Sequence, residues 1–355
     1  MQASLCDARV SGRFRKGLGA HMKKLMQFMP DSFTLLIVAT VGVASFLPCY
    51  GIGAVIFSHL TTLAIAVMFF MQGARLSREA VVAGIGHWRL HLVILASTFV
   101  MFPILTFGFR ALFPHLLDPY VMLGLLYISL LPSTVQSSIA FTSMAQGNVP
   151  AAICSATFST MLGVVVTPIA AGLLLGTSHH GGMDFRGIEE VFAELLLPFV
   201  VGQILRPWIA GWAARNQSLL KVTDRGSIIL VVYTAFSAAV VRGIWHQLPL
   251  SGFGEIVLAN GLLLTAALLI TTYGSRALGF AKPEEIAIVF CGSKKSAATG
   301  VPMANILFGA STVGFVVLPL IIFHQMQLLA CSMIARHYAR KHEEARRAAD
   351  SSARA

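Results

Sequence analysis

The sequence predicts an all-α membrane protein with ten membrane-spanning helices. Of its 355 residues, 56% are apolar and only 12% are charged, whereas about 25% of residues are charged in an ordinary soluble domain. The mean hydropathy of the chain is +0.76. Its apolar residues gather in long runs, and a helix needs about 20 such residues to cross a bilayer. These observations argue against a soluble enzyme, a disordered chain and a disulfide-linked scaffold.

Each expected helix is an apolar run that ends where charged or polar residues begin. The first five runs lie between a basic tail (1–30) and a polar outer connection (177–189), and they cover Asp31–Pro48, Ala54–Gln72, Leu90–Phe113, Tyr120–Ala145 and Val149–Gly176. The second five precede a basic tail (336–355), and they cover Glu190–Ile204, Ser227–His246, Glu255–Tyr273, Glu285–Phe308 and Ser311–Met333. The chain is thereby divided into two five-helix halves, residues 31–176 and 190–335.

The net charge of +11 comes from basic residues that lie in blocks between the apolar runs. This placement is typical of residues that orient a membrane protein, so no nucleic-acid partner is expected. The two tails and the connections on their side hold 21 of the 26 Lys and Arg residues, and the opposite side has only Arg110, Arg186 and Arg242. We therefore expect both termini in the cytoplasm, in a protein of the plasma membrane or the bacterial inner membrane.

The two halves are expected to be inverted relative to one another, because each holds an odd number of helices. Polar residues interrupt the fourth and ninth runs at matching places: residues 131–138 read Leu-Pro-Ser-Thr-Val-Gln-Ser-Ser, and residues 291–296 read Cys-Gly-Ser-Lys-Lys-Ser. Inside a membrane a broken helix is tolerated only where its backbone is buried or lines a cavity. A matched pair of breaks therefore indicates a binding site.

The polar residues of these breaks are the candidate binding residues for a substrate or an ion. They are Thr134, Gln136, Ser137 and Ser138 in the fourth run and Ser293, Lys294, Lys295 and Ser296 in the ninth. Thr98 of the third run is a softer candidate, because a Thr in a membrane helix often bonds only its own backbone. The runs contain no Ser/His, Asp/Asp or His/Glu constellation, so no enzyme is expected and no metal site is indicated with certainty.

Lys294 and Lys295 are the most informative residues, because a charged lysine at the centre of a membrane helix costs roughly 2.5–3.5 kcal/mol. Successive helical residues point about 100° apart, so both lysines face one cavity only if the backbone is unwound there. Three roles stay open: counter-ion of an anionic substrate, proton carrier, or fixed cation in place of a sodium ion. A structural pair with a buried acid is the competing interpretation, but the carboxylates lie near the ends of the runs.

The residues around both breaks resemble those of a known transporter family. The run from Pro132 to Pro168, with Gln146-Gly147-Asn148 between two spans, resembles the bile acid:sodium symporter family. Residues 290–296 and the following Gly300-Val301-Pro302-Met303 resemble its sodium-bile-acid-symporter-like branch. The resemblance covers residues 31–334. It implies a panel domain and a core domain, in which the broken fourth and ninth helices cross at the centre.

The resemblance also implies where this chain departs from the better-understood branch. Members of that branch have a carboxylate and a Gln, both sodium ligands, in the ninth-helix break, and by register Phe290 and Lys294 stand in their places. Their fourth-helix Ser-Asn pair meets Ser138-Ile139, and their third-helix Gln meets Thr98. Because an ammonium repels a cation, we expect that Lys294 replaces one sodium ion. A remaining sodium ion would be held by Gln136, Ser137 and Ser138.

The predicted function is that of a secondary transporter that moves a small organic solute, with an organic anion expected, by alternating access. The coupling ion is Na⁺ or H⁺, or transport is uncoupled, and no other cofactor is expected. The expected partners are the solute and the lipid bilayer, and a monomer is assumed. One alternative is a monovalent cation/proton antiporter, which normally needs membrane-embedded acids. The other is a non-transporting membrane regulatory protein, for which the connections are too short.

Overall fold

The computed structural model describes residues 32–75, 87–114, 116–175, 192–241, 243, 250–309 and 312–352. These residues form helices and no strand, which confirms the all-α prediction. Seven helices of this described part are long and apolar enough to cross a membrane: Ile52–Arg75, Trp88–Leu112, Val149–Leu175, Ala193–Arg215, Gln217–Val241, Gly252–Ala277 and Val313–Glu344. The predicted basic tail (1–30) and outer connection (177–189) lie outside the described residues.

Three of the ten predicted spans correspond to shorter helices. The first is α2 (Ser32–Phe46). The fourth is divided into α7 (Pro119–Leu130) and α8 (Gln136–Met144), and the ninth into α15 (Lys282–Gly292) and α16 (Ala297–Leu307). Each of these four half-helices has 9 to 12 residues. At 1.5 Å per residue such a helix extends about 16 Å, roughly half of a bilayer's hydrocarbon core. Each pair can therefore cross the core only as two half-helices joined near its middle.

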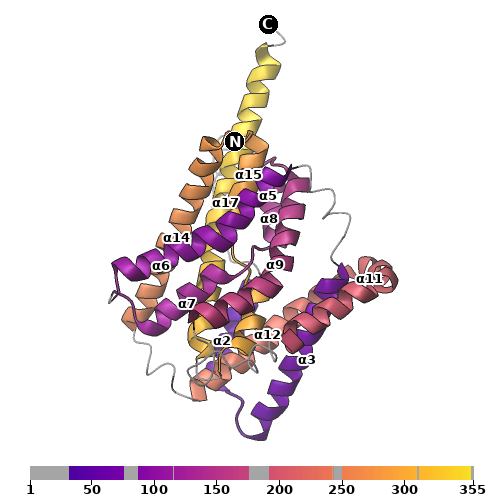
Figure 1. The fold of residues 1–355 in the computed structure, drawn as a ribbon, viewed down its shortest axis with the longest axis vertical. Helices are drawn as coiled ribbons and strands as arrows, with labels where there is room; N and C mark the ends of the chain where they lie inside the picture. Colours follow the sequence, from indigo (N-terminus) through magenta and orange to yellow (C-terminus); the bar gives the residue numbers. More distant parts are fainter. Residues whose placement is uncertain are drawn as a thin grey trace, which may run out of the picture.

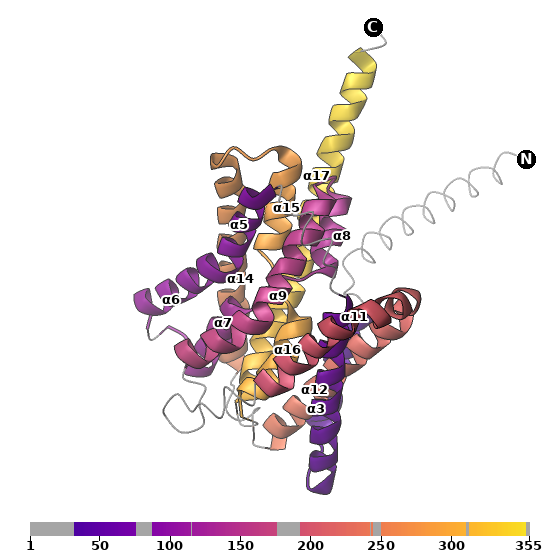
Figure 2. The ribbon, with the colours of Figure 1, turned by 45° about the vertical axis from the view of Figure 1, so that its right-hand side comes forward.

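Two groups of helices lie side by side (Figures 1 and 2). The first group holds α2, α3 (Ile52–Arg75), α11 (Leu197–Arg215) and α12 (Gln217–Val241), in which α3 packs along α11 and α12 packs along α2 and α3. Contacts from α12 to α16 and α17 join this group to the second. The second group comprises α5 (Trp88–Ala96), η2 (Ser97–Met101), α6 (Phe102–Leu112), α7, α8, α9 (Val149–Leu175), α14 (Leu250–Ala277), α15, α16 and α17 (Val313–Ser352).

Glycines bring α3 and α11 into direct backbone contact. A Cβ atom at Gly73 would overlap the Phe199 carbonyl oxygen, and a Cβ atom at Gly202 would overlap the Phe70 carbonyl oxygen. Small residues at such a crossing let two membrane helices approach closely, which increases their van der Waals attraction. The two glycines therefore fix the distance between these helices.

The connection between α11 and α12 differs from the prediction. The basic residues Arg206, Arg215, Lys221 and Arg225 were expected in a loop, but all four lie within the two helices, which only Asn216 separates. The physical reason is that long basic side chains reach the polar zone of a membrane from helical positions near its surface. Basic charge thus marks the end of a span without marking the end of its helix.

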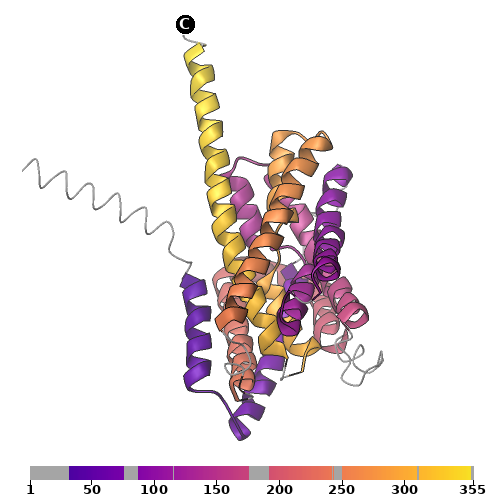
Figure 3. The same ribbon diagram turned by 90° about the vertical axis from the view of Figure 1, so that its left-hand side faces the viewer.

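The last helix, α17, is longer than the predicted span. It runs for 40 residues without a break at residue 335, where the basic tail was expected to begin. Figure 3 shows its end standing well clear of the other helices. The residues after 335 are rich in Ala, Glu and Arg, which favour helix even in water. The helix therefore continues after its apolar part ends.

Candidate functional site

The two helix breaks contact one another through hydroxyl and backbone groups. The Ser133 hydroxyl donates to the carbonyl oxygen of Cys291 (2.6 Å), and the Ser138 hydroxyl donates to that of Phe290 (2.8 Å). Both carbonyl groups belong to the last turn of α15. No later residue of that helix supplies an amide that could donate to them. The first break thus satisfies the end of the half-helix that precedes the second.

The second break satisfies the first in return. The Ser296 amide donates to the carbonyl oxygen of Pro132 (2.8 Å), and the Ser296 hydroxyl caps α16 by accepting from the Thr299 amide (3.2 Å). The Ser133 amide donates to the hydroxyl of Ser159 on α9 (2.9 Å). These contacts meet the requirement that backbone groups inside a membrane be satisfied by the protein.

Lys295 is fully buried and binds three backbone carbonyl groups. Its Nζ atom donates to the carbonyl oxygens of Thr98 (2.6 Å), Ser129 (2.8 Å) and Leu131 (2.8 Å). It also lies 4.3 Å from the centre of the Phe102 ring, where a cation is attracted by the negative ring face. An ammonium group has three N–H donors, so these carbonyl groups occupy all of them.

Local irregularities free these carbonyl groups for Lys295. Around Thr98 the helix widens into the π-helix η2, where the Phe102 amide donates to Ser97 instead of Thr98. The next residue is Pro103, which has no amide hydrogen. On α7, the Ser133 amide that could reach Ser129 is turned toward Ser159. The lysine thus replaces amide donors that the helices lack.

Gln327 of α17 holds the backbone of Lys295 from the other side. The Lys295 amide donates to the Gln327 Oε1 atom (2.9 Å), and the Gln327 Nε2 atom donates to the Lys295 carbonyl oxygen (2.8 Å). The same Nε2 atom lies 2.8 Å from the Nδ1 atom of His324. One glutamine therefore supplies the two hydrogen bonds that an adjacent helical turn would otherwise supply.

Lys294 is also fully buried, but its surroundings are much less complete. Its Nζ atom donates to the hydroxyl of Ser137 (3.0 Å) and lies 4.1 Å from the centre of the Phe141 ring. Within the described residues, neither lysine takes part in an ion pair. The interpretation of the lysines as partners of a buried acid therefore has no support in this part of the chain.

Most of the other predicted site residues lie at the breaks, but they serve different purposes. The Thr134 hydroxyl lies 2.8 Å from that of Ser137 and 3.1 Å from that of Ser138. The Ser293 hydroxyl bonds within its own helix, to Val289, and the Thr98 hydroxyl does the same with Ile94. For Thr98, the carbonyl group and not the hydroxyl contacts the site.

Gln136 lies apart from this cluster and lines a basic pocket of about 320 Å³. Gln136 is the first residue of α8, and the rest of the pocket wall comes from the ends of α3, α11 and α12. Arg75, Arg206 and Lys221 supply three positive charges, and Arg75 forms a two-point ion pair with Asp224 (2.8 and 3.1 Å). The pocket lies between the two groups of helices and suits a negatively charged molecule.

Three of these contributors are not predicted from the sequence. Gln327 is a single polar residue in an apolar run, a signal shared by many residues that only link helices. Arg206 and Lys221 have the placement of charges that orient the chain. Their role in a pocket depends on α11 and α12 folding back against α3, which no local pattern reveals.

Comparisons with known proteins show the family of the chain. Residues 31–340 match the SBF-like CPA transporter family. Protein PA2026 of Pseudomonas aeruginosa is 51% identical over 319 residues, which cover 90% of this chain and 96% of the relative. The Escherichia coli protein named "Putative symporter YfeH" is 50% identical over 323 residues, 91% and 97% of the two chains. Sodium/bile acid cotransporter 7 of Rattus norvegicus is 29% identical over 323 residues, 88% and 94% of the two chains.

Proposed function

Because the chain belongs to the SBF-like CPA transporter family and is thus a multi-pass membrane transporter and not an enzyme, we propose that it carries a small organic anion by alternating access. The observation that carries this proposal is the basic pocket beside the broken helices. Its three cationic side chains face a cavity of about 320 Å³, which is large enough for a small organic molecule.

The anion would pass from this pocket to Lys294. Gln136 at the pocket wall is followed in α8 by Ser137, whose hydroxyl accepts from the Lys294 ammonium. Lys294 has two N–H donors beyond this bond, and a buried ammonium gains most from a charged acceptor. An anionic group of the substrate is such an acceptor. Lys294 is therefore the residue that we assign to the substrate.

Lys295 has a different role in this proposal, because it fills a cage of three carbonyl oxygens. Hard cations such as sodium prefer oxygen ligands of this kind. The ammonium group acts as a permanent cation there, so the chain needs no sodium ion at that place. Transport is then coupled to a proton or to no ion, because a sodium ion near Ser137 and Ser138 would lie beside the Lys294 ammonium, which repels it.

The architecture that we propose has ten spans in two inverted five-helix repeats. The group of α2, α3, α11 and α12 forms the panel domain, and the other helices form the core domain. The mutual hydrogen bonds of the two breaks, such as Ser133 to Cys291 and Ser296 to Pro132, support a crossing at the centre of the core. The basic pocket opens on the cytoplasmic side, with both termini inside, because the positive-inside rule puts Arg206 and Lys221 there.

A ligand screen tests the substrate class and the role of Lys294. Purified protein is melted in detergent with a panel of organic anions and their neutral amides, in sodium and in potassium buffers. A ligand that binds only the folded protein raises the melting midpoint by mass action. We expect hits among the anions in both buffers, their retention in Lys294→Arg and their loss in Lys294→Gln. Arg340→Gln, which removes a positive charge outside both basic pockets, is the control and should keep them.

Other outcomes would change the assignment. Hits that survive Lys294→Gln would remove Lys294 from the site, and hits that need sodium would restore ordinary sodium symport. Hits confined to alkali cations would favour the cation/proton antiporter. Uptake of the identified anion into proteoliposomes then separates a transporter from a regulatory protein that only binds.

A further inference from the structure

A second basic pocket, of about 340 Å³, lies between the ends of α14, α15 and α17, where α17 begins to protrude. Arg276 of α14, Lys282 of α15 and Lys341 of α17 line it, together with His337, Tyr338 and the apolar residues Met333 and Ile334. We propose that this pocket binds the phosphate group of an anionic phospholipid. The site is separate from the basic pocket at Gln136 and does not depend on the transport proposal.

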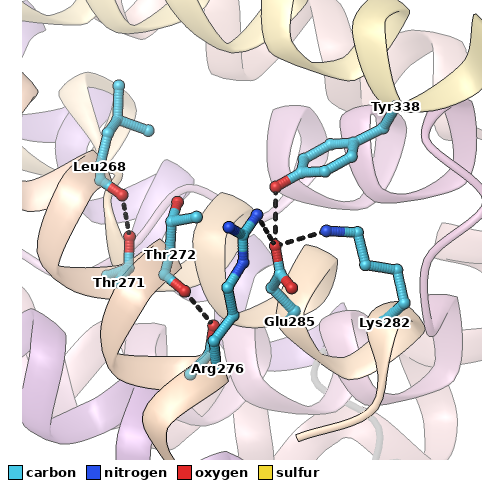
Figure 4. Close-up of polar contacts among 8 residues, drawn as sticks. Leu268, Thr271, Thr272, Arg276, Lys282, Glu285 and Tyr338 are labelled. Atoms are coloured by element: carbon cyan, nitrogen blue, oxygen red, sulfur yellow. Dashed lines mark hydrogen bonds and ion pairs between the residues drawn. The ribbon is translucent and has the colours of Figure 1, made fainter. Parts of the chain in front are cut away.

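A buried carboxylate organises the basic side chains of this pocket (Figure 4). The Oε1 atom of Glu285 accepts from the Lys282 ammonium (2.7 Å), the Arg276 guanidinium (3.0 Å) and the Tyr338 hydroxyl (3.0 Å). The Glu285 side chain is only 4% exposed, so it binds its partners from the buried side of the pocket. It thereby ties the end of α17 to the consecutive helices α14 and α15.

The pocket keeps a positive charge after this pairing. Arg276, Lys282 and Lys341 carry three positive charges and Glu285 carries one negative charge, which leaves two. The side chains of Arg276 and Lys282 are 48% and 52% exposed. An arginine has five N–H donors and a lysine has three, so each has donors beyond its bond to Glu285. A phosphate group provides acceptor oxygens of the opposite charge.

The surroundings of the pocket favour a lipid over a soluble anion. Tyr273 is 62% exposed, and such aromatic residues are typical of the level of the lipid headgroups. The Arg276 guanidinium lies 5.6 Å from the centre of the Tyr273 ring, which places it at that level. Met333 and Leu329, one turn apart on α17, expose apolar surface where an acyl chain can lie.

Lipid binding to the full chain in detergent tests the proposal. Native mass spectrometry would count bound phosphatidylglycerol and, in a parallel arm, phosphatidylcholine with the same acyl chains. We expect phosphatidylglycerol to be retained in preference. Lys341→Gln should weaken its binding about fivefold, the contribution of one basic residue near an anionic surface. Within the described residues Lys341 makes no ion pair with Glu285, so this change leaves the carboxylate cluster intact.

Arg340→Gln is the matched control, because Arg340 precedes Lys341 on the same helix but does not line the pocket. It should bind phosphatidylglycerol as the wild type does, and Lys341→Arg should as well. Equal retention of the two lipids, or equal binding by Lys341→Gln and Arg340→Gln, would overturn the proposal. Glycerol 3-phosphate that displaces the lipid at equal concentration would also overturn it, because the pocket would then be a site for a soluble anion.

Discussion

At the scale of single residues, two neighbouring lysines are buried to the same degree but satisfied very differently. Lys295 binds three carbonyl groups, whereas Lys294 binds one hydroxyl and lies over one aromatic ring. A buried charge needs its full set of partners to offset the cost of desolvation, and one with few partners costs free energy unless a ligand completes the set. Under the proposed function, this contrast distinguishes a structural lysine from one that is available to the substrate.

The two lysines should therefore respond differently to the same substitution. Lys295→Met removes the donor of three buried carbonyl groups and should lower the free energy of unfolding by roughly 3 kcal/mol or more, since bonds to charged groups contribute about 1.5–3 kcal/mol each. Lys294→Met should leave it unchanged or raise it. Melting midpoints in detergent without ligand measure both effects. Equal losses in the two variants would contradict the distinction.

The sequence identifies both lysines but does not distinguish them. The unusual feature, two charges in an apolar run, is visible to any reading of the sequence. The partners that give them different roles come from other runs: Thr98 and Ser129 precede Lys295 by more than 160 residues. Which lysine contacts which partner depends on how the half-helices pack against each other. The spacing of residues along the chain does not predict this packing.

At the scale of elements, the breaks were predictable and the π-helix was not. Both breaks are indicated in the sequence by runs of small and polar residues in an otherwise apolar stretch. The π-helix η2 contains only Ser97 and Thr98 as polar residues, and Pro103 just beyond it is equally typical of a simple kink. Its role becomes apparent only when the freed Thr98 carbonyl group is seen to contact Lys295.

The crossing of α3 and α11 should be very sensitive to added volume. Gly73→Ala or Gly202→Ala would force a methyl group into a backbone carbonyl and should destabilise the protein by about 1–3 kcal/mol, the usual cost of overpacking. Gly211→Ala on the same α11 is the control, because a Cβ there meets no atom within 4 Å. It should be neutral or stabilise by up to about 1 kcal/mol, since Ala favours helix more than Gly. Thermal melting distinguishes these cases, and equal stability changes in all three variants would contradict the close contact at Gly73 and Gly202.

At the scale of the whole molecule, the basic pocket between the two groups of helices has an orientation that can be measured. Cys49 lies in the connection between α2 and α3, and Lys221 lines the pocket near the other end of α3. We expect a membrane-impermeant maleimide to modify Cys49 in intact cells. In a background with Cys6→Ser and Cys49→Ser, Lys221→Cys should react only in inside-out vesicles.

Cys154, Cys291 and Cys331 are buried and give this experiment a low background. The variant with Cys6→Ser and Cys49→Ser but without Lys221→Cys is the control, because any maleimide that it takes up must have reacted with these three cysteines. Reaction of Lys221→Cys in intact cells would reverse the proposed orientation and move the pocket to the outer face. The sequence alone predicts the orientation from the distribution of basic residues. The pocket cannot be predicted in this way, because it depends on contacts between helices from both halves.

The three-carbonyl cage of Lys295 also bears on how the chain is made. The ribosome synthesises Thr98, Ser129 and Leu131 long before Lys295, so their helices are in the membrane first. When the ninth segment leaves the translocon, its lysine therefore meets acceptors that are already waiting, which offsets the roughly 2.5–3.5 kcal/mol of inserting a charge. Gln327 is synthesised 32 residues later and then binds the backbone of Lys295. In the order of synthesis, the three acceptors of the Lys295 ammonium thus precede it, and the last helix supplies the final partner of its backbone.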